Sequence, residues 1–481
     1  MKKIGLSAVE AEELRKKYPE FVYKGYTYET KARDLHISFD FAVPARRGGG
    51  GEIKFRPRVV IKNMPYGLLS RAKQPWFDNL VFHLGLAEMP SYWKATASPK
   101  IIIEAGSLNK AQINWWHYVF TRGMGQYFYE NKIDFRPKNF LAIESSGKGR
   151  EDLLTSEVNK SGVNEPGRIL VPIGGGKDAV VTYELLKKAH AQIRPFVLNP
   201  KREQEAILKV MGERNPIIVE RTIDPELLEL NRKGYLNGHT PFSAYLAFLT
   251  TLCAALFDYK YIALSNERSS NEGNVDYLGS TINHQYSKSF DFEKKFRAYS
   301  KKYLAENVDY FSFLRPLYEL QIAKLFSQYP KYFGAFLSCN EAHKTASGSK
   351  KPTGTWCGKC SKCLFVFASL YPFGEEKQLI SIFGSNLFRD QSLIPLMEEL
   401  VGDRRFKPFE CVGTIKESLA AFYLCLRKTH PPFPALLKHF RQHIAKKHPD
   451  LHESERKIMS SWNTQHTIPL NLEKRLRSVL H

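Results

Sequence analysis

The middle of the chain alternates between short apolar runs and segments with helical spacing. The apolar runs lie at 168–173, 193–198, 216–222 and 259–265, and helical segments follow the first two at 180–191 and 202–213. Alternation of this kind is typical of strands joined by crossover helices. It predicts an α/β fold with a mainly parallel, doubly wound sheet, whose ligands bind beyond the carboxyl ends of the strands.

The N-terminal part has a different pattern. Residues 26–43 and 52–62 alternate between apolar and polar side chains, and the stretch 46–51 between them is glycine-rich, as in a hairpin tip. A helical segment follows at 109–131. These features predict an α+β domain, and they contain no catalytic spacing.

Changes in composition suggest three parts. The polar segment 147–167 is interpreted as a linker, and the tail from about residue 376 is mostly helical and basic. We therefore predict an N-terminal domain with its linker at 1–160, a central domain at 161–375 and a helical C-terminal region at 376–481.

Three features of the chain predict a cytoplasmic protein without a membrane span. The most apolar window, 241–257, is shorter than the roughly 20 residues of a bilayer crossing, so it is interpreted as a buried helix. The first residues are charged every few positions and lack the apolar core of an export signal. Seven cysteines in such a chain favour reduced thiols or metal ligation over disulfides.

The chain is strongly basic, with 71 lysines and arginines against 49 acidic residues and a net charge of +22. The excess is spread along the chain. A field of this sign attracts nucleic acid, acidic lipid or phosphate-bearing small molecules, and a basic surface that only aids solubility fits equally well.

The first apolar run ends in a glycine turn that is suited to an anion. Gly174, Gly175 and Gly176 are followed by Lys177 and Asp178 at the start of a helical segment. Backbone N–H groups can approach a phosphate closely at glycines, and a helix N-terminus favours negative charge. A glycine turn that only connects a strand to a helix is the alternative interpretation.

Three known phosphate loops can be compared with this turn. A Walker A loop does not fit, because Val171 and Asp178 stand where it requires glycine and a hydroxyl residue. A dinucleotide fingerprint fits poorly, because the next apolar run ends at Asn199 instead of an acidic residue. The turn is most similar to the Ser-Gly-Gly-x-Asp-Ser loop of ATP pyrophosphatases, with both serines replaced.

Four cysteines form a candidate metal site at Cys339, Cys357, Cys360 and Cys363. Thiolates with two-residue gaps suit a tetrahedral structural zinc ion, with His343 as a substitute ligand. Unliganded buried thiols are the alternative. Cys253, Cys411 and Cys425 are predicted to lie in the core. An upstream cysteine followed by Cys-Gly-x-Cys-x-x-Cys also resembles the pyrophosphatases that make the queuosine precursor.

Several further motifs occur in one order along the chain. They are LNGHTPFSA (236–244), SNERSSNEGN (265–274), NHQYSKSFDFEK (283–294), FLRPLYEL (313–320), WCGKCSKCLFVF (356–367) and FKPFECVG (406–413). With the glycine loop they resemble the bacterial UDP-N-acetylmuramoyl-L-alanyl-L-glutamate epimerase family, within the ATP pyrophosphatase superfamily. The similarity runs from about residue 168 to 418. Ala179 departs from it, because the family's loop usually has a serine there.

The resemblance implies an ATP pyrophosphatase fold of the HUP type, an N-terminal α+β domain and a helical, cysteine-rich C-terminal region. It implies inversion of the terminal L-glutamate of a UDP-linked muramoyl dipeptide, with ATP cleaved to AMP and pyrophosphate. Gly174 to Gly176 and Lys177 would hold pyrophosphate, and Asp178 would help to place Mg²⁺. The substrate also implies a functional link to a ligase that adds L-glutamate to the muramoyl-L-alanine precursor.

The main candidate proton-transfer residues lie between the glycine loop and the cysteine motif. His239, Glu267 and Arg268 lie in family-like motifs where strands and helices meet, so Glu267 is interpreted as a base or metal ligand and Arg268 as a carboxylate clamp. A helix cap is the alternative for His239, and a surface ion pair is the alternative for Glu267 and Arg268. Lys288 is interpreted as an exposed lysine, with a phosphate contact as the alternative. Cys411 is interpreted as a core residue, with a role as acid or base as the alternative.

Two rival functions remain open. A pyrophosphatase that adenylates a tRNA base for thiolation would explain the basic charge more directly. A non-catalytic nucleic-acid-binding protein with a decayed loop at Ala179 is the second. A nucleic-acid partner is therefore not predicted but kept as an alternative to the epimerase.

Overall fold

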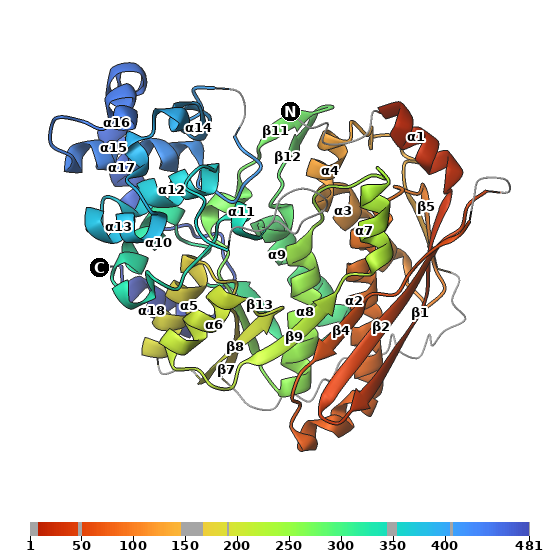
Figure 1. Ribbon diagram of the computed structural model, residues 1–481. Helices are drawn as coiled ribbons and strands as arrows, with labels where there is room; N and C mark the ends of the chain where they lie inside the picture. The colour runs from red at the N-terminus through yellow and green to blue at the C-terminus, as the bar shows by residue number, and fades with distance from the viewer. Residues whose placement is uncertain are drawn as a thin grey trace.

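The computed structural model describes residues 8–46, 51–145, 167–189, 192–343, 354–404 and 407–480. One sheet of eleven strands runs through it (Figure 1). In spatial order the strands are β13 (Asp309–Ser312), β10 (Tyr261–Leu264), β7 (Arg168–Pro172), β8 (Gln192–Leu198), β9 (Ile217–Thr222), β4 (Arg58–Ile61), β2 (Asp34–Val43), β1 (Glu20–Lys31), β5 (Lys100–Ile103) and β6 (Ala142–Ser145), with β3 (Ile53–Phe55) beside β2.

The central strands confirm the predicted alternation. Strands β13, β10, β7, β8 and β9 are parallel, and α5 (Lys177–Lys188) and α6 (Arg202–Met211) connect β7 to β8 and β8 to β9. From β7 the chain moves to β8 and β9 on one side, then returns to β10 on the other. The order therefore reverses between β7 and β10, which is where sheets of this type bind ligands.

The sheet continues from the central strands into the N-terminal part. Strand β4 pairs antiparallel with both β9 and β2, so strands on both sides of residue 160 share one sheet. The glycine-rich stretch joins β2 to its antiparallel partner β3, as a hairpin requires. Residues 47–50 of this tip and 147–166 of the interpreted linker lie outside the described residues. The sheet as a whole is therefore mixed and mostly parallel. The antiparallel junction between its two parts was not predicted, because hydrophobic alternation identifies a strand but not its neighbours.

Helices cover both faces of the central strands. Along β7, Ile169 and Val171 belong to one hydrophobic cluster and Leu170 to another, because successive side chains point to opposite faces. One cluster contains α2 (Pro75–Trp93), α8 (Phe242–Phe257) and α9 (Phe290–Tyr303), and the other contains α5, α6, α10 (Glu319–Ser327) and α12 (Ser361–Leu370). Almost all of α8 is buried, as predicted for its apolar sequence.

The remaining short elements complete the N-terminal and central parts. The helices are α1 (Ala8–Lys17), α3 (Lys110–Gly123), α4 (Gly125–Glu130), α7 (Pro225–Arg232) and α11 (Asn340–His343), and β11 (Val275–Tyr277) pairs with β12 (Ser280–Ile282) in a separate hairpin. No helix among the described residues is both long and apolar enough to cross a bilayer.

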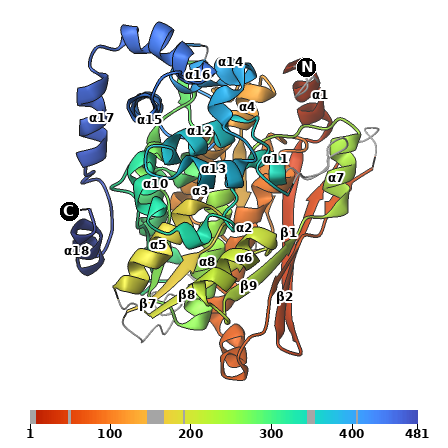
Figure 2. The ribbon, with the colours of Figure 1, turned by 60° about the vertical axis from the view of Figure 1, so that its left-hand side comes forward.

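The C-terminal region is helical, as predicted. Its helices are α13 (Glu376–Phe383), α14 (Ile394–Leu400), α15 (Ile415–Lys428), α16 (Ala435–His439), α17 (Leu451–Ser460) and α18 (Leu470–Ser478). Helix α15 packs between α12 and α17, and α18 returns to lie beside α5 (Figure 2). The region therefore packs on the α5 face of the sheet.

Candidate active site

The glycine turn lies at the carboxyl end of β7 and leads into α5. Gly175 has a φ of +87°, and a Cβ there would lie 2.7 Å from Cγ of Glu203. Gly176 is the N-cap of α5, whose N-terminal end receives no side-chain cap from the part of the chain that the structure describes. A Cβ at Gly174 would meet nothing within 4 Å. The turn therefore presents backbone donors and the positive end of a helix dipole toward open space, which fits a phosphate group.

Lys177 is buried and held by two carboxylates. Its ammonium pairs with Asp178 and with the buried Glu319 at the first position of α10. Burial disfavours the charge, but the two acids raise the pKa of Lys177 above its usual value. Glu319 has a second cation, Lys362, at 3.6 Å. Burial raises the pKa of Glu319, yet Lys177 and Lys362 lower it to about 2.

Glu267 follows β10, at the strand end next to that of β7. It is only 6% exposed, and its Oε2 atom has no hydrogen-bond partner among the described residues. Burial, together with the charges of Glu319 and Asp178, raises the pKa of Glu267 to about 7. The carboxyl group is thus close to half protonated near neutral pH, as a group that both takes and gives a proton requires.

Lys288 occupies the space between these acids and a loop of the C-terminal region. Its Nζ atom lies 3.3 Å from Sγ of Cys411, which is half-buried. Cys411, followed by Glu267, raises the pKa of Lys288 above its usual value. The prediction that Cys411 lies in the core is wrong, because its sulfur faces an ammonium group instead of apolar side chains. Cys253 and Cys425 are buried as predicted.

Two histidines border the same region. His239 lies before α8 and His284 after β12, with ring centroids 6.1 Å apart. Burial, followed by each ring's cationic neighbours including Lys288, lowers the pKa of both to about 3. His284 donates from Nδ1–H to Oδ1 of Asn274 at 2.8 Å, while its buried Nε2 has no partner in the described part of the chain. Both rings are therefore neutral at physiological pH.

The structure brings Asp178, His239 and Glu267 around Lys288, but it does not bring Arg268 there. The Arg268 guanidinium donates to Oγ of Ser461 at 2.7 Å and lies 4.4 Å from the ring centroid of Tyr318. The interpretation of Arg268 as a carboxylate clamp has no support from this position. The arginine beside Glu267 is the fully buried Arg315, which donates to the Glu267 carbonyl oxygen at 2.8 Å.

The four predicted cysteines form one cluster. The sulfur atoms of Cys339, Cys357, Cys360 and Cys363 lie within 4.8 Å of one another, and three of the pairs are 3.5, 3.7 and 3.9 Å apart. A tetrahedron with zinc–sulfur bonds of about 2.3 Å has sulfur atoms about 3.8 Å apart. The cluster therefore fits a structural zinc ion, and His343 is not part of it.

The cysteine cluster is joined to the candidate active site by two short connections. Leu337, just before Cys339, donates its backbone N–H to the carbonyl of Gly175 at 2.8 Å. Lys362, between Cys360 and Cys363, pairs with Glu319 and donates to the carbonyl oxygen of Cys411. A metal ion in the cluster would thus fix both the glycine turn and the second cation of Glu319.

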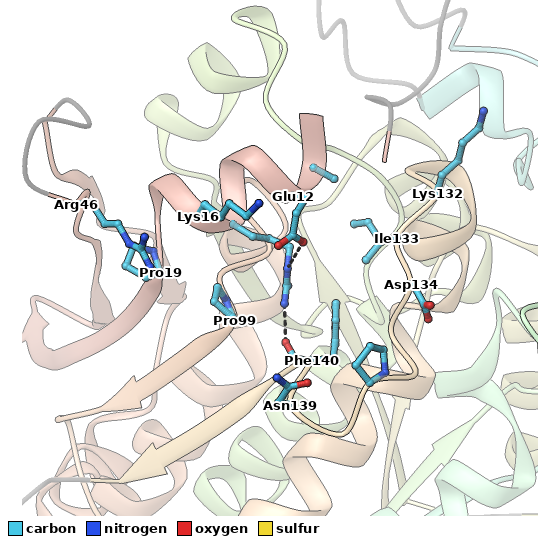
Figure 3. A pocket seen from close by; sticks show the side chains of 13 residues that line it. Glu12, Lys16, Pro19, Arg46, Pro99, Lys132, Ile133, Asp134, Asn139 and Phe140 are labelled. Atoms are coloured by element: carbon cyan, nitrogen blue, oxygen red, sulfur yellow. Dashed lines mark hydrogen bonds and ion pairs between the residues drawn. The ribbon is translucent and has the colours of Figure 1, made fainter. Parts of the chain in front are cut away.

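A separate hollow of about 470 Å³ lies between α1 and the loop that follows α4 (Figure 3). Glu12 and Phe140 line it from opposite sides, and both contact Arg15. The guanidinium donates to the carbonyl oxygens of Ala97 and Phe140. Its donors thus hold the backbone together, so the hollow does not offer them to a ligand.

Two residues of the site, Glu319 and Lys362, were not predicted, whereas Lys288 and Cys411 were candidates with an exposed and a core position, respectively, as the alternatives. Glu319 lies in the motif FLRPLYEL and Lys362 in WCGKCSKC. The motifs were a signal that these segments matter. A motif does not indicate which side chain points inward, so the individual residues could not be chosen.

Known protein families and relatives match most of the chain. Residues 12–313 match the MurL N-terminal domain and residues 335–455 the MurL C-terminal domain. A UDP-N-acetyl-alpha-D-muramoyl-L-alanyl-L-glutamate epimerase from Micromonospora is 33% identical over 83% of this chain and 86% of its own. Proteins of the same name from Salinispora tropica and Xanthomonas oryzae are each 32% identical, over 84% and 81% of this chain and 84% and 83% of their own.

Proposed function

Because the chain belongs to the MurL epimerase family and is an epimerase, we propose that it inverts the terminal L-glutamate of UDP-N-acetylmuramoyl-L-alanyl-L-glutamate in peptidoglycan precursor synthesis. The observation that carries the proposal is the similarity to relatives of that name over more than four fifths of the chain. The substrate places the enzyme after a ligase that adds L-glutamate to the muramoyl-L-alanine precursor.

The reaction needs activation of the glutamate carboxylate. Removing the α-proton beside a carboxylate would create a second negative charge next to the first. Joining the carboxylate to AMP removes its charge and withdraws electrons, so the α-carbon can carry the developing charge. We propose that the carboxylate oxygen attacks the α-phosphorus of ATP, and that pyrophosphate leaves.

The geometry of the glycine turn supports this use of ATP. The turn occupies the reversal point of the sheet, and Lys177 follows it directly as the first residue of α5. We propose that pyrophosphate binds the backbone of Gly174 to Gly176 and takes the place of a carboxylate on Lys177. Asp178 and Glu319, which share that lysine, are suited to Mg²⁺, since Mg²⁺ binds one or two carboxylates together with substrate phosphates. Bound Mg²⁺ would neutralise phosphate charge.

Glu267 is proposed as one proton-transfer residue. It is buried, its pKa is about 7, and one oxygen is without a hydrogen-bond partner in the described part of the chain. We assign the neutral His239 a positioning role beside Lys288. The four cysteines are proposed to hold a structural zinc ion, which closes its coordination shell with thiolates and leaves no position for substrate.

The first rival function rested on the loop shared by all pyrophosphatases and on the basic charge, and the second on the charge and on Ala179 in the loop. The family matches extend over residues 12–313 and 335–455, far beyond those features. No contact in the described residues favours tRNA over a nucleotide-linked peptide.

The proposal is tested by incubating the enzyme with UDP-N-acetylmuramoyl-L-alanyl-L-glutamate, ATP and Mg²⁺, followed by chiral analysis of the glutamate. D-glutamate should form only with ATP, and AMP and pyrophosphate should accumulate. An oxygen-18 label placed in the substrate carboxylate should appear in AMP. A product that stays entirely L would overturn the proposed function, and unlabelled AMP would overturn carboxylate attack alone.

A further inference from the structure

The loop that carries Cys411 is held firmly against the residues around Glu267. It connects α14 to α15, and Asn274 donates to the carbonyl of Pro408 at 2.8 Å. On the opposite side, the backbone N–H of Lys362 donates to the carboxylate of Glu410 at 2.7 Å, and the Lys362 ammonium donates to the Cys411 carbonyl. The sulfur of Cys411 is therefore fixed in place by the β11–β12 hairpin and by the start of α12.

The sulfur of Cys411 has a cationic partner. The Lys288 ammonium lies at hydrogen-bond distance from Sγ, 3.3 Å away, and a neighbouring lysine is typical of reactive cysteines. Cys411 also remains half-buried, whereas Cys253 and Cys425 are enclosed by apolar side chains. Of these three cysteines outside the metal cluster, only Cys411 combines access with a cationic partner.

Two buried polar atoms near Lys288 lack partners among the described residues. They are Oε2 of Glu267 and Nε2 of His284, and each side chain is only 6% exposed. Lys288 interacts electrostatically with both Cys411 and Glu267, and with His284. Buried polar groups are normally satisfied, so unsatisfied ones around a single cation point to a polar ligand between them.

We propose that Cys411, paired with Lys288, is a second proton-transfer residue that acts on the glutamate α-carbon from the face opposite Glu267. The inference rests on the proposed function, because it takes the acyl-adenylate of the muramoyl dipeptide as the reacting group. A single base returns the proton to the face from which it came. Two groups on opposite faces of a planar intermediate give inversion directly.

In the proposed step, Cys411 takes the α-proton of the L-glutamate residue. The α-carbon–hydrogen bond breaks, a sulfur–hydrogen bond forms, and the electron pair moves into the acyl carbonyl as an enolate. The Lys288 ammonium compensates the charge. The protonated carboxyl group of Glu267 then gives its proton to the other face of the carbon. Water hydrolyses the acyl-adenylate to the carboxylate and AMP, and both side chains exchange protons with solvent.

The test uses the full-length enzyme with ATP, Mg²⁺ and the L-glutamate substrate in deuterium oxide. Two variants, Cys411→Ala and Glu267→Gln, should each lose epimerisation by a factor on the order of 100 to 10,000 while still releasing AMP. In Cys411→Ala the L-glutamate α-proton should stay unexchanged, because Cys411 takes that proton. In Glu267→Gln deuterium should enter the α-position without inversion, because the other face cannot be protonated. Exchange in both variants, or in neither, would overturn the pairing of the two residues.

The matched control is Cys253→Ala, which removes a thiol from α8 and should leave epimerisation within about threefold of wild type. Epimerisation by Cys411→Ala at the wild-type level would also overturn the proposal. If wild-type enzyme forms no D-glutamate, the proposed function fails first, so the two failures are distinguishable.

A measurement on wild-type enzyme removes the dependence on variant folding. Iodoacetamide should alkylate Cys411 faster than Cys253 or Cys425, as read by mass spectrometry of the peptides. Substrate together with ATP should slow alkylation of Cys411 at least tenfold, and Lys288→Met should slow it without substrate. Alkylation that neither substrate nor Lys288→Met affects would place Cys411 outside the site.

Discussion

The start of α10 and the loop after β10 each bury a glutamate, but only the first surrounds it with cations. Glu319 contacts Lys177 and Lys362, and its pKa falls to about 2. Glu267 has its pKa raised to about 7, since burial and neighbouring acids outweigh Lys288 and Arg315. Burial raises the pKa of both, so the number of close cations decides the outcome.

This difference divides the site into two regions with different chemistry. The region of Glu319 and Lys177 keeps its charges at all physiological pH values, which suits the binding of a metal ion and phosphates. The region of Glu267 holds a carboxyl group that changes its protonation near neutral pH, which suits proton transfer. The two regions lie at the ends of adjacent strands, so one substrate can reach both.

The largest expected effect comes from Glu267→Gln, which removes the titrating group of the second region. Epimerisation should fall on the order of 100- to 10,000-fold, because the amide cannot take up a proton. AMP release should persist. The exposed Glu306→Gln is the matched control and should behave as wild type. Measured by chiral analysis of the product, equal activity of both variants would remove Glu267 from the mechanism.

Lys177→Met tests the first region, because it would make Glu319 resemble Glu267. ATP cleavage should fall on the order of 100- to 1,000-fold through loss of the phosphate-binding charge. The free energy of unfolding should fall by about 3 kcal/mol, since Asp178 and Glu319 lose a buried partner. AMP formation and urea unfolding measure the two effects. Lys188→Met, on the exposed side of α5, should change neither.

Removal of metal from the cysteine cluster should weaken the first region selectively. Cys360→Ser, or a strong zinc chelator, should release zinc and lower the melting temperature. ATP cleavage should fall about 10- to 100-fold, because Lys362 loses its fixed position beside Glu319. Zinc release is measured with a chromogenic chelator. Wild-type protein that contains no metal, or retained ATP cleavage after its removal, would contradict the connection.

The last expected effect concerns stability alone, and it depends on pH. Glu267 has a folded-state pKa of about 7 against a usual 4.5, so it binds more protons when folded than when unfolded between these values. Its contribution to stability is complete below pH 4.5 and is lost as the pH rises to about 7. Glu267→Gln should therefore equal wild type in stability near pH 4.5 and exceed it by up to about 3 kcal/mol at pH 8.

Urea unfolding at a series of pH values gives this difference directly. Glu417, whose burial also raises its pKa to about 7, should show the same behaviour in Glu417→Gln. Glu319 should show the opposite sign, because its contribution is present above pH 4.5 and is lost as the pH falls toward 2. A difference between wild type and Glu267→Gln that stays constant with pH would show that Glu267 is not protonated in the folded state.

The local features of this protein were determined by the sequence itself. The alternation of apolar runs predicted the parallel strands, the glycines predicted a turn at the end of β7, and the cysteine spacing predicted the metal-type cluster. Each of these signals depends on residues close together in the chain. Backbone geometry and metal coordination restrict them so strongly that the residue types and their spacing are sufficient.

Only the tertiary structure decided which distant side chains meet. The pairing of β9 with β4 makes one sheet from two parts of different pattern. The contact between Lys288 and Cys411 joins residues 123 positions apart. Glu319 stands between Tyr318 and Leu320 and Glu267 between Asn266 and Arg268, and these sequence neighbours do not show which glutamate is surrounded by cations. Burial and electrostatic partners depend on packing between segments, so the protonation of the site is a property of the folded chain.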